Sequence, residues 1–294
     1  MANSTNANQI PNDSKGIRKW SGKTTSDKCW NVYMGDAYHV LCSLPENTYD
    51  CVITSPPYYW LRDYGVNNQI GQEETVAEYV EAISNVMDQV FRVLKPEGVL
   101  FLNIGDTYYS GKGQSHGTDP KNKARRFGLR AVDKSGGLGI GLRPKSIIGV
   151  PWRVAVEMCS REWVLRSPII WHRKHCLPES VLDRPRRSYE YVFMFTKSRH
   201  YYFDRSVLID DEVEDMWTIS ARPKSTNGIE TAPFPDEIVE RCLALGCPAN
   251  GKVLDPFAGS GTTLRVALNS GRDSVGVELS PACCAYIIKE IKKL

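Results

Sequence analysis

The segment Thr54-Ser55-Pro56-Pro57-Tyr58 follows a short apolar run, Cys51-Val52-Ile53, that is typical of a buried strand. Two consecutive prolines remove two backbone donors and restrict two φ angles, so the carbonyls beside them are held rigidly outward. The Ser55 hydroxyl and the Pro56 carbonyl are hydrogen-bond acceptors, and Tyr58 adds an aromatic face. These groups suit an amino group on an aromatic ring, because its lone pair is delocalised and its N–H groups need acceptors. Taken alone, the tetrapeptide is better explained as a proline-stiffened surface turn.

A glycine-rich turn, Asp255-Pro256-Phe257-Ala258-Gly259-Ser260-Gly261-Thr262-Thr263, lies between a predicted strand and a predicted helix. Glycine lets backbone approach a ligand closely, and open α/β sheets bind ligands at the carboxyl ends of their strands. The turn contains neither the GK[ST] of a phosphate-binding loop nor the spacing GxGxxG. The next predicted strand ends in Glu278, where a carboxylate can accept hydrogen bonds from ribose hydroxyls. Together the two features favour a nucleoside cofactor over a plain tight turn and a solvated glutamate.

The segment from Thr107 to Ser146 is rich in glycine and strongly basic. It contains nine Lys and Arg residues against Asp119 and Asp133, so its formal charge is +7 and that of the remainder is −4. A basic segment of this kind suits a polyanion. The alternative on charge alone is a solvated, disordered loop.

Short apolar runs alternate with amphipathic stretches, which predicts an α/β fold with a largely parallel sheet. Strands are expected at residues 30–34, 51–53, 99–104, 164–171, 191–196, 252–254 and 274–277. Helices are expected at residues 73–94, 151–162, 235–245, 262–269 and 280–294. The strands at 164–171 and 191–196 are predicted to form a hairpin at the edge of the sheet.

The 294 residues, of which 41% are hydrophobic, suffice for one large catalytic domain, which we place at 28–294. Residues 1–27 are rich in Asn, Ser and Thr and are predicted to be a flexible tail. No apolar run approaches the roughly 20 residues of a membrane span, so no membrane contact is expected. The nine cysteines form no CxxC pair and indicate reduced thiols of a cytoplasmic protein. His172, His175 and Cys176 lack a second ligand pair, so no metal is predicted.

The order of the two motifs, TSPPY before DPFAGSGTT, resembles the amino-methyltransferases of bacterial and phage DNA, in the permuted (beta) class. The resemblance extends from about Asn31 to Leu294 and includes VLFLNIGD at 99–106, RPRRSYEYVFMFTKS at 184–198 and APFP at 232–235. It implies the Rossmann-like α/β fold of the S-adenosylmethionine-dependent methyltransferases. The sheet would be seven-stranded and mostly parallel, with an antiparallel hairpin edge and a circularly permuted motif order.

The resemblance also implies roles for individual residues. The target base would be flipped out of the duplex and held by the catalytic residues Ser55, Pro56, Pro57 and Tyr58. S-adenosylmethionine would be bound by Asp36, Phe234, Asp255, Pro256, Phe257, Gly259, Ser260, Gly261, Thr262 and Glu278. Methyl transfer would be direct, without a covalent enzyme intermediate. A carbon-5 cytosine enzyme would need a Pro-Cys dipeptide, and the chain has none.

Serine in the first position of the tetrapeptide is typical of cytosine-N4 enzymes, whereas aspartate is commoner in adenine-N6 enzymes. We therefore predict methylation of the N4 amino group of cytosine in double-stranded DNA, in a restriction-modification or DNA-protection context. Adenine-N6 methylation is the alternative. Rival functions are a methyltransferase for RNA or a protein amide, a catalytically silent DNA-binding regulator with the same fold, and a nicotinamide dehydrogenase.

The chain departs from the family between Phe203 and Trp217, where a long target-recognition segment is often found and only about a dozen mostly acidic residues occur here. Base recognition must therefore come from other basic stretches. The residues predicted to contact DNA are Lys121, Lys123, Arg125, Arg126, Arg184, Arg186 and Arg187. A cognate restriction endonuclease as partner, and the choice between monomer and homodimer, are left open.

Overall fold

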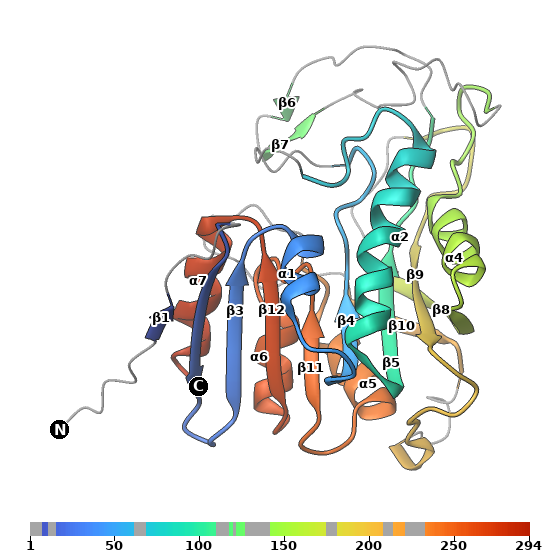
Figure 1. Cartoon of the computed structure of the whole chain (residues 1–294). Helices are drawn as coiled ribbons and strands as arrows, with labels where there is room; N and C mark the ends of the chain where they lie inside the picture. The colour runs from blue at the N-terminus through green and yellow to red at the C-terminus, as the bar shows by residue number, and fades with distance from the viewer. Residues whose placement is uncertain are drawn as a thin grey trace.

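The apolar runs of the sequence form the strands of a central sheet in a computed structural model of the chain. The structure describes residues 8–10, 16–61, 69–109, 118–119, 122–126, 142–174, 181–207, 214–220 and 233–294. The sheet order is β1 (Asn8–Ile10), β2 (Arg18–Lys23), β3 (Cys29–Met34), β12 (Asp273–Glu278), β11 (Lys252–Asp255), β4 (Tyr49–Thr54), β5 (Leu94–Ile104), β9 (Tyr189–Thr196), β8 (Val164–Lys174) and β10 (Met216–Ser220) (Figure 1). A separate short hairpin consists of β6 (Thr118–Asp119) and β7 (Asn122–Arg126).

The middle of the sheet is parallel, as predicted. β3, β12, β11, β4 and β5 pair in parallel, and β9 pairs antiparallel with both β5 and β8. The predicted hairpin edge is therefore confirmed as β8 and β9. The order also brings β4, which precedes the tetrapeptide, next to β11, which precedes the glycine-rich turn.

In the part of the chain that the structure describes, the sheet has ten strands, three more than the seven that were predicted. The strands from β3 to β8 in the sheet order account for the seven. β1 and β2 extend one edge, and β10 extends the other by pairing in parallel with β8.

The assignment of residues 1–27 to a flexible tail is corrected where the chain is described. Arg18–Lys23 forms β2 and pairs antiparallel with β3, with Trp20 opposite Val32. The segment is mostly polar, so its composition does not indicate a strand. Backbone pairing with β3 is what makes it one. Gly22 contributes by admitting the Trp30 ring, since a Cβ at this position would lie 2.6 Å from a ring carbon.

Helices cover both faces of the sheet (Figure 1). One face packs against α1 (Ala37–Ser43), α2 (Val76–Val93) and α4 (Val150–Ser160), and the other against α5 (Asp236–Gly246), α6 (Thr262–Asn269) and α7 (Pro281–Ile291). The alternation of β5 explains the two layers, since Leu100 and Leu102 face the first set of helices and Val99 and Phe101 the second. A short 3-10 helix, η1 (Arg205–Val207), follows β9.

Local signals set the ends of α2. The Thr75 hydroxyl accepts from the Glu78 N–H and the Glu78 carboxylate accepts from the Thr75 N–H, which is a capping box. The helix ends at Val93, and the strand that follows begins at Leu94 and runs through Lys95-Pro96-Glu97-Gly98. None of the helices in the described ranges is long and apolar enough to cross a membrane.

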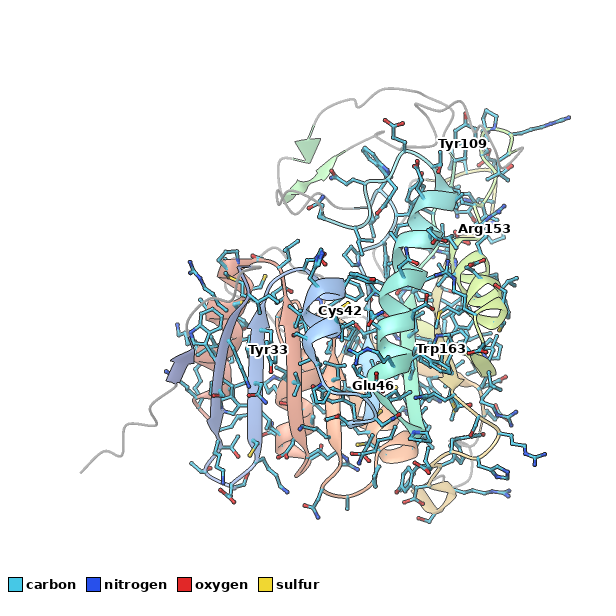
Figure 2. The ribbon with its side chains drawn as sticks, in the orientation of Figure 1. Tyr33, Cys42, Glu46, Tyr109, Arg153 and Trp163 are labelled. Atoms are coloured by element: carbon cyan, nitrogen blue, oxygen red, sulfur yellow. The ribbon has the colours of Figure 1, made fainter. Side chains whose placement is uncertain are left out.

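The carboxyl ends of the parallel strands lie at one end of the molecule. Hairpin β6–β7 lies at this same end in Figure 1. In the view of Figure 2, Tyr109, which follows β5, lies at the same end of the molecule as the start of α2, and Glu46 lies towards the other end. The Tyr109 N–H donates to the Ser146 carbonyl over 2.9 Å, so the two ends of the basic segment meet here.

Candidate active site

The two motifs that the sequence singled out are joined by a buried hydrogen bond. The Thr54 hydroxyl, at the end of β4, donates to Oδ1 of Asp255, at the end of β11, over 2.6 Å. Asp255 is only 2% exposed, and the same oxygen accepts from the Phe257 N–H over 3.0 Å. A second link runs from the Thr263 hydroxyl to the Ile53 carbonyl over 3.3 Å. The tetrapeptide and the glycine-rich turn therefore form one site, although 201 residues of sequence separate Thr54 from Asp255.

Glu278 lies beside the glycine-rich turn, as the spacing predicted. Its Oε2 accepts from the Gly259 N–H over 2.8 Å, and its Oε1 accepts from the Ser280 N–H over 2.7 Å. Each carboxylate oxygen can accept a further hydrogen bond. Two oxygens held in fixed positions at the end of β12 suit a pair of ribose hydroxyls.

Burial raises the pKa of both carboxyls. The pKa of Glu278 rises to about 7, against the lowering effect of the Ser280 and Gly259 N–H donors. The pKa of Asp255 rises to about 6, again because burial outweighs its hydrogen bonds. A ligand that supplies hydroxyl donors or positive charge would favour the ionised forms.

Asp36 is brought close to Glu278 because β3 pairs with β12. The Gly35 N–H donates to the Glu278 carbonyl over 3.0 Å, and Asp36 follows as the N-cap of α1. Its Oδ1 accepts from the His39 N–H over 3.0 Å, and its side chain is 38% exposed. Asp36 is thus available at the predicted cofactor edge.

Phe234, another predicted cofactor residue, packs its ring into the core. It is 9% exposed and belongs to a cluster that includes Ile53 and Val266. The helix that follows it, α5, is joined to α6 by an ion pair between Asp236 and Arg265. Pro256, Phe257, Ser260, Gly261 and Thr262 follow Asp255 in the turn and the start of α6.

The tetrapeptide is held from both sides. The Tyr79 hydroxyl donates to the Pro57 carbonyl over 2.8 Å, and the Trp60 N–H donates to the Gly71 carbonyl over 2.7 Å. Tyr58 packs so closely on Gly105 that a Cβ there would lie 2.7 Å from its ring. Ser55 and Tyr58 are both partly exposed, so each residue keeps part of its surface open to a ligand.

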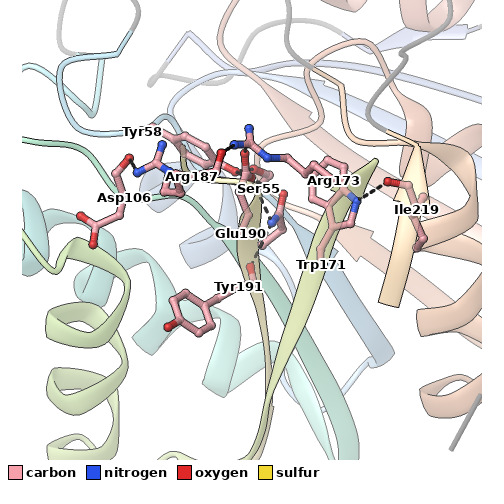
Figure 3. Close-up of polar contacts among 10 residues, drawn as sticks. Ser55, Tyr58, Asp106, Trp171, Arg173, Arg187, Glu190, Tyr191 and Ile219 are labelled. Carbon is pink, nitrogen blue, oxygen red and sulfur yellow. Dashed lines mark hydrogen bonds and ion pairs between the residues drawn. The ribbon is translucent and has the colours of Figure 1, made fainter. Parts of the chain in front are cut away.

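Three further residues of this site were missed by the sequence analysis. The Tyr58 hydroxyl donates to Oε2 of Glu190 over 2.6 Å and lies 3.2 Å from Oδ1 of Asn103 (Figure 3). Glu190 is in turn paired with Arg173 at 2.9 Å. The sequence did contain a signal for two of them, because Arg173 and Glu190 are charged residues beside the predicted strands 164–171 and 191–196. The antiparallel pairing of β9 with β5, and of β8 with β9, brings these residues to Tyr58.

The predicted DNA-contacting residues fall into different environments. Lys121 lies outside the described residues, and Lys123, Arg125 and Arg126 lie in strand β7. Arg186 is exposed, Arg184 stacks over the Tyr108 ring at 3.9 Å, and Arg187 donates to the Asp106 carbonyl. Arg187 therefore anchors its segment beside the tetrapeptide.

Asp106 ties both ends of the basic segment to the sheet. Its Oδ1 accepts from the Thr107 N–H over 2.8 Å and from the Val150 N–H over 3.0 Å, and Gly149 donates to the same carboxylate. The chain segment 107–149 therefore begins and ends at the carboxyl end of β5. Burial raises the pKa of Asp106, against these donors.

Within the described ranges no group of three or more His, Cys, Asp and Glu side chains is arranged to hold a metal. Of the ligands weighed from the sequence, His172 lies 3.3 Å from the Thr218 hydroxyl. His175 and Cys176 lie outside the described residues.

A comparison with protein-family models decides the family. Residues 49–290 match the N6/N4 methyltransferase model, described as DNA methylase, and this span contains both motifs. The chain belongs to the N6/N4 DNA methylase family. A curated relative, the type II methyltransferase M.SmaI of Serratia marcescens, is 40% identical over 258 residues, which cover 85% of this chain and 86% of the relative.

Solved structures of DNA methylases share the fold. The PvuII DNA methyltransferase, cytosine-N4-specific by name, aligns with a TM-score of 0.68 at 21% identity, covering 93% of this chain and 95% of its own. A putative DNA modification methylase of Thermus thermophilus, complexed with S-adenosyl-L-methionine, aligns with a TM-score of 0.59 at 25% identity, covering 88% and 93%. The fold is thus that of the S-adenosylmethionine-dependent methyltransferases, and the cofactor of this DNA methylase is S-adenosylmethionine.

The glycine-rich turn of the methylase fits this cofactor. A Cβ at Gly259 would meet no atom closer than 3.9 Å, so the backbone presents an open surface next to Glu278. Gly261 is different, because a Cβ there would lie 2.9 Å from Ile287 in the core. Both residues have positive φ, +55° and +79°, which favours glycine at each.

The two glycines therefore predict separable defects. Gly261→Ala should lower the free energy of unfolding by about 2–4 kcal/mol, from the left-handed backbone and the clash with Ile287. Gly259→Ala should cost about 1–2 kcal/mol of stability, yet weaken S-adenosylmethionine binding by about 10-fold or more, since its methyl group enters the open surface. Thermal unfolding and calorimetric titration of the two variants would distinguish the effects. Wild-type affinity in a folded Gly259→Ala protein would contradict the position given to the cofactor.

Proposed function

We propose that this DNA methylase transfers a methyl group to the N4 amino group of cytosine in double-stranded DNA. The single observation that carries the choice of base is Ser55 in the first position of the tetrapeptide, where the family often has aspartate in adenine enzymes. The likeness to the PvuII enzyme is one of fold, so the base preference rests on Ser55. Because the curated relatives are named type II methyltransferases, a companion restriction endonuclease is part of the proposal.

The geometry of Ser55 supports an acceptor role. Its hydroxyl donates over 3.4 Å to the Tyr58 hydroxyl, which leaves the lone pairs of Oγ for an incoming N–H group. The Pro56 carbonyl is the proposed second acceptor; Pro57 disfavours the helical conformation at Pro56, which is itself buried. With part of its ring open, Tyr58 offers a surface on which an extruded base could stack.

When bound, S-adenosylmethionine supplies the methyl group. Glu278 holds the ribose of the cofactor, and Gly259 leaves room for the cofactor to lie against the backbone. Ser55 holds the amino group of the base. Flipping the base costs a few kcal/mol, which stacking and amino-group hydrogen bonds offset. Thr54 and Asp255 join the two halves of the site, so cofactor and base are held in a fixed relation.

The decisive experiment is methylation-sensitive sequencing of DNA from cells that express the chain. It identifies the modified base and the sequence around it together. Methyl groups on the N4 position of cytosine at a recurring site are the expected result. Methyl groups found on adenine alone would overturn the choice of base and leave the methylase activity intact.

The basic segment 107–146 is proposed to bind the DNA backbone. Replacing Arg125 and Arg126 together by alanine should weaken DNA binding and reduce the slope of log affinity against log salt by about 2, since each lost phosphate contact contributes about 0.9. The exposed pair Lys289 and Lys292 at the end of α7, changed to alanine, is the charge-matched control and should leave the slope unchanged. Fluorescence anisotropy at several salt concentrations provides the measurement, and equal slopes for wild type and the arginine variant would refute the assignment.

A further inference from the structure

A line of hydrogen bonds runs from Ser55 through Tyr58 to Glu190 in the sheet (Figure 3). Ser55 Oγ donates to the Tyr58 hydroxyl over 3.4 Å, and the Tyr58 hydroxyl donates to Glu190 Oε2 over 2.6 Å. The other oxygen of Glu190 is paired with Arg173 Nη1 at 2.9 Å. Glu190 is only 9% exposed, so this line ends in a charge that is largely shielded from solvent.

The direction of these bonds follows from the chemistry of the last member. An ionised carboxylate accepts hydrogen bonds and donates none. Tyr58 has one hydroxyl proton, which the short contact places on the bond to Glu190, so its oxygen is left to accept from Ser55. Burial, and secondly the charge of Glu190, raise the pKa of Tyr58, so the phenol keeps that proton.

The direction matters for the reaction. A serine hydroxyl that turned towards the base could donate to the amino nitrogen and occupy the lone pair that must form the new bond. With its proton committed to Tyr58, Ser55 can only accept from the amino group. The amino lone pair is then free to point at the methyl group.

We propose that Glu190, held by Arg173, is a positioning residue that sets the direction of the Ser55–Tyr58 hydrogen bonds and thereby makes Ser55 an acceptor for the target amino group. This inference rests on the acceptor role of Ser55 given above. It holds for either base, because cytosine and adenine both present an exocyclic amino group.

Arg173 determines which way the side-chain amide points in a Glu190→Gln variant. The Arg173 guanidinium has only donors, so it selects the amide oxygen of the glutamine and turns the amide NH2 towards Tyr58. Tyr58 would then accept from the glutamine and donate to Ser55 or Asn103, which reverses the line. A glutamine of nearly the same size therefore removes the acceptor while it preserves the packing.

The experiment compares kcat, the KM for DNA and the Kd for S-adenosylmethionine in Glu190→Gln and Glu190→Asp. We expect kcat to fall about 10-fold in Glu190→Gln, the effect of one misdirected hydrogen bond, with KM and Kd within about 2-fold of wild type. Glu190→Asp keeps an acceptor-only carboxylate and should recover most of kcat, although aspartate is shorter. A purely structural role predicts the opposite order, with glutamine better than aspartate, and that result would overturn the proposal.

Tyr58→Phe keeps the test decisive if Glu190→Gln fails to fold, and the double variant sharpens the test if Glu190→Gln folds. Tyr58→Phe retains the ring and breaks the line, so it should lower kcat by a similar factor; wild-type kcat in this variant would also overturn the proposal. In a Tyr58→Phe background, Glu190→Gln should cause no further loss, whereas multiplying losses would show two independent roles and contradict it. If Ser55→Ala keeps full activity, the proposed site itself fails; if only Ser55→Ala is impaired and Glu190→Gln is not, the positioning inference alone fails.

Discussion

Replacing Ser55 by alanine is expected to lower kcat by about 10- to 100-fold while the protein folds and binds S-adenosylmethionine normally. The amino nitrogen gains positive charge as it is alkylated, and a hydrogen bond to a charged group contributes about 1.5–3 kcal/mol. Ser55 is partly exposed, and its side-chain bond to Tyr58 spans 3.4 Å; the Tyr58 hydroxyl keeps its own bond to Glu190 when Ser55 becomes alanine. The measurement is single-turnover methylation of a DNA duplex that contains the recognition site.

A serine elsewhere in the fold provides the control for this result. Ser160 is exposed at the far end of α4 and donates to the Glu157 carbonyl over 2.7 Å. Ser160→Ala should therefore keep wild-type kcat. If Ser55→Ala matched Ser160→Ala in rate, the tetrapeptide would lose its place as the site of amino-group binding.

Replacing Glu278 by glutamine is expected to weaken S-adenosylmethionine binding by about 10- to 100-fold. Gly259 and Ser280 donate to different oxygens of the carboxylate, so an amide must turn its NH2 towards one of these N–H groups. The variant thus loses acceptors for the ribose and disturbs the turn that presents Gly259. Isothermal titration with S-adenosylmethionine measures the change, and Glu240→Gln, exposed on α5, is the control.

The same carboxylate predicts how affinity depends on pH. Burial raises the pKa of Glu278 to about 7 in the ligand-free protein, and the ionised form is the better acceptor for hydroxyl donors. Affinity should therefore fall as the pH is lowered from about 8 to about 6, by up to about 10-fold per unit below the pKa. Glu278→Gln should remove this dependence and leave a smaller one from Asp255, whose pKa is about 6. A wild-type affinity that stays constant over this range would contradict the ionised role of Glu278.

Much of the site could be predicted because its signals are local. Pro-Pro after an apolar run, glycines in a strand-to-helix turn and a glutamate one βαβ unit later are each visible within a few residues. The pairing of β11 with β4 and β12 then places them together, as open α/β sheets require. Glu190, Arg173 and Asn103 were missed for the opposite reason, since a charged or amide residue inside a strand gains its role only from the neighbouring strand.

The sequence by itself determined the buried central strands and most of the helices; α1 (Ala37–Ser43) was not among the predicted helices. The helix predicted at 262–269 is α6 with the same bounds, because Gly261 begins it with a left-handed residue and the apolar spacing continues it. The helix predicted at 73–94 is α2 to within a few residues, since Thr75 and Glu78 cap it and Leu94 begins the next strand. These signals act between residues that are close in the chain.

Only the tertiary structure decided the edges of the sheet and the polar network behind Ser55. β2 is mostly polar and β10 is only five residues long, and each strand pairs with the backbone edge that β3 or β8 offers. The line from Ser55 through Tyr58 to Glu190 and Arg173 likewise joins the end of β4 to β9 and β8, which meet through long-range pairing. Hydrogen bonds of this kind depend on distance in space, and the residue pattern along one strand does not contain that distance.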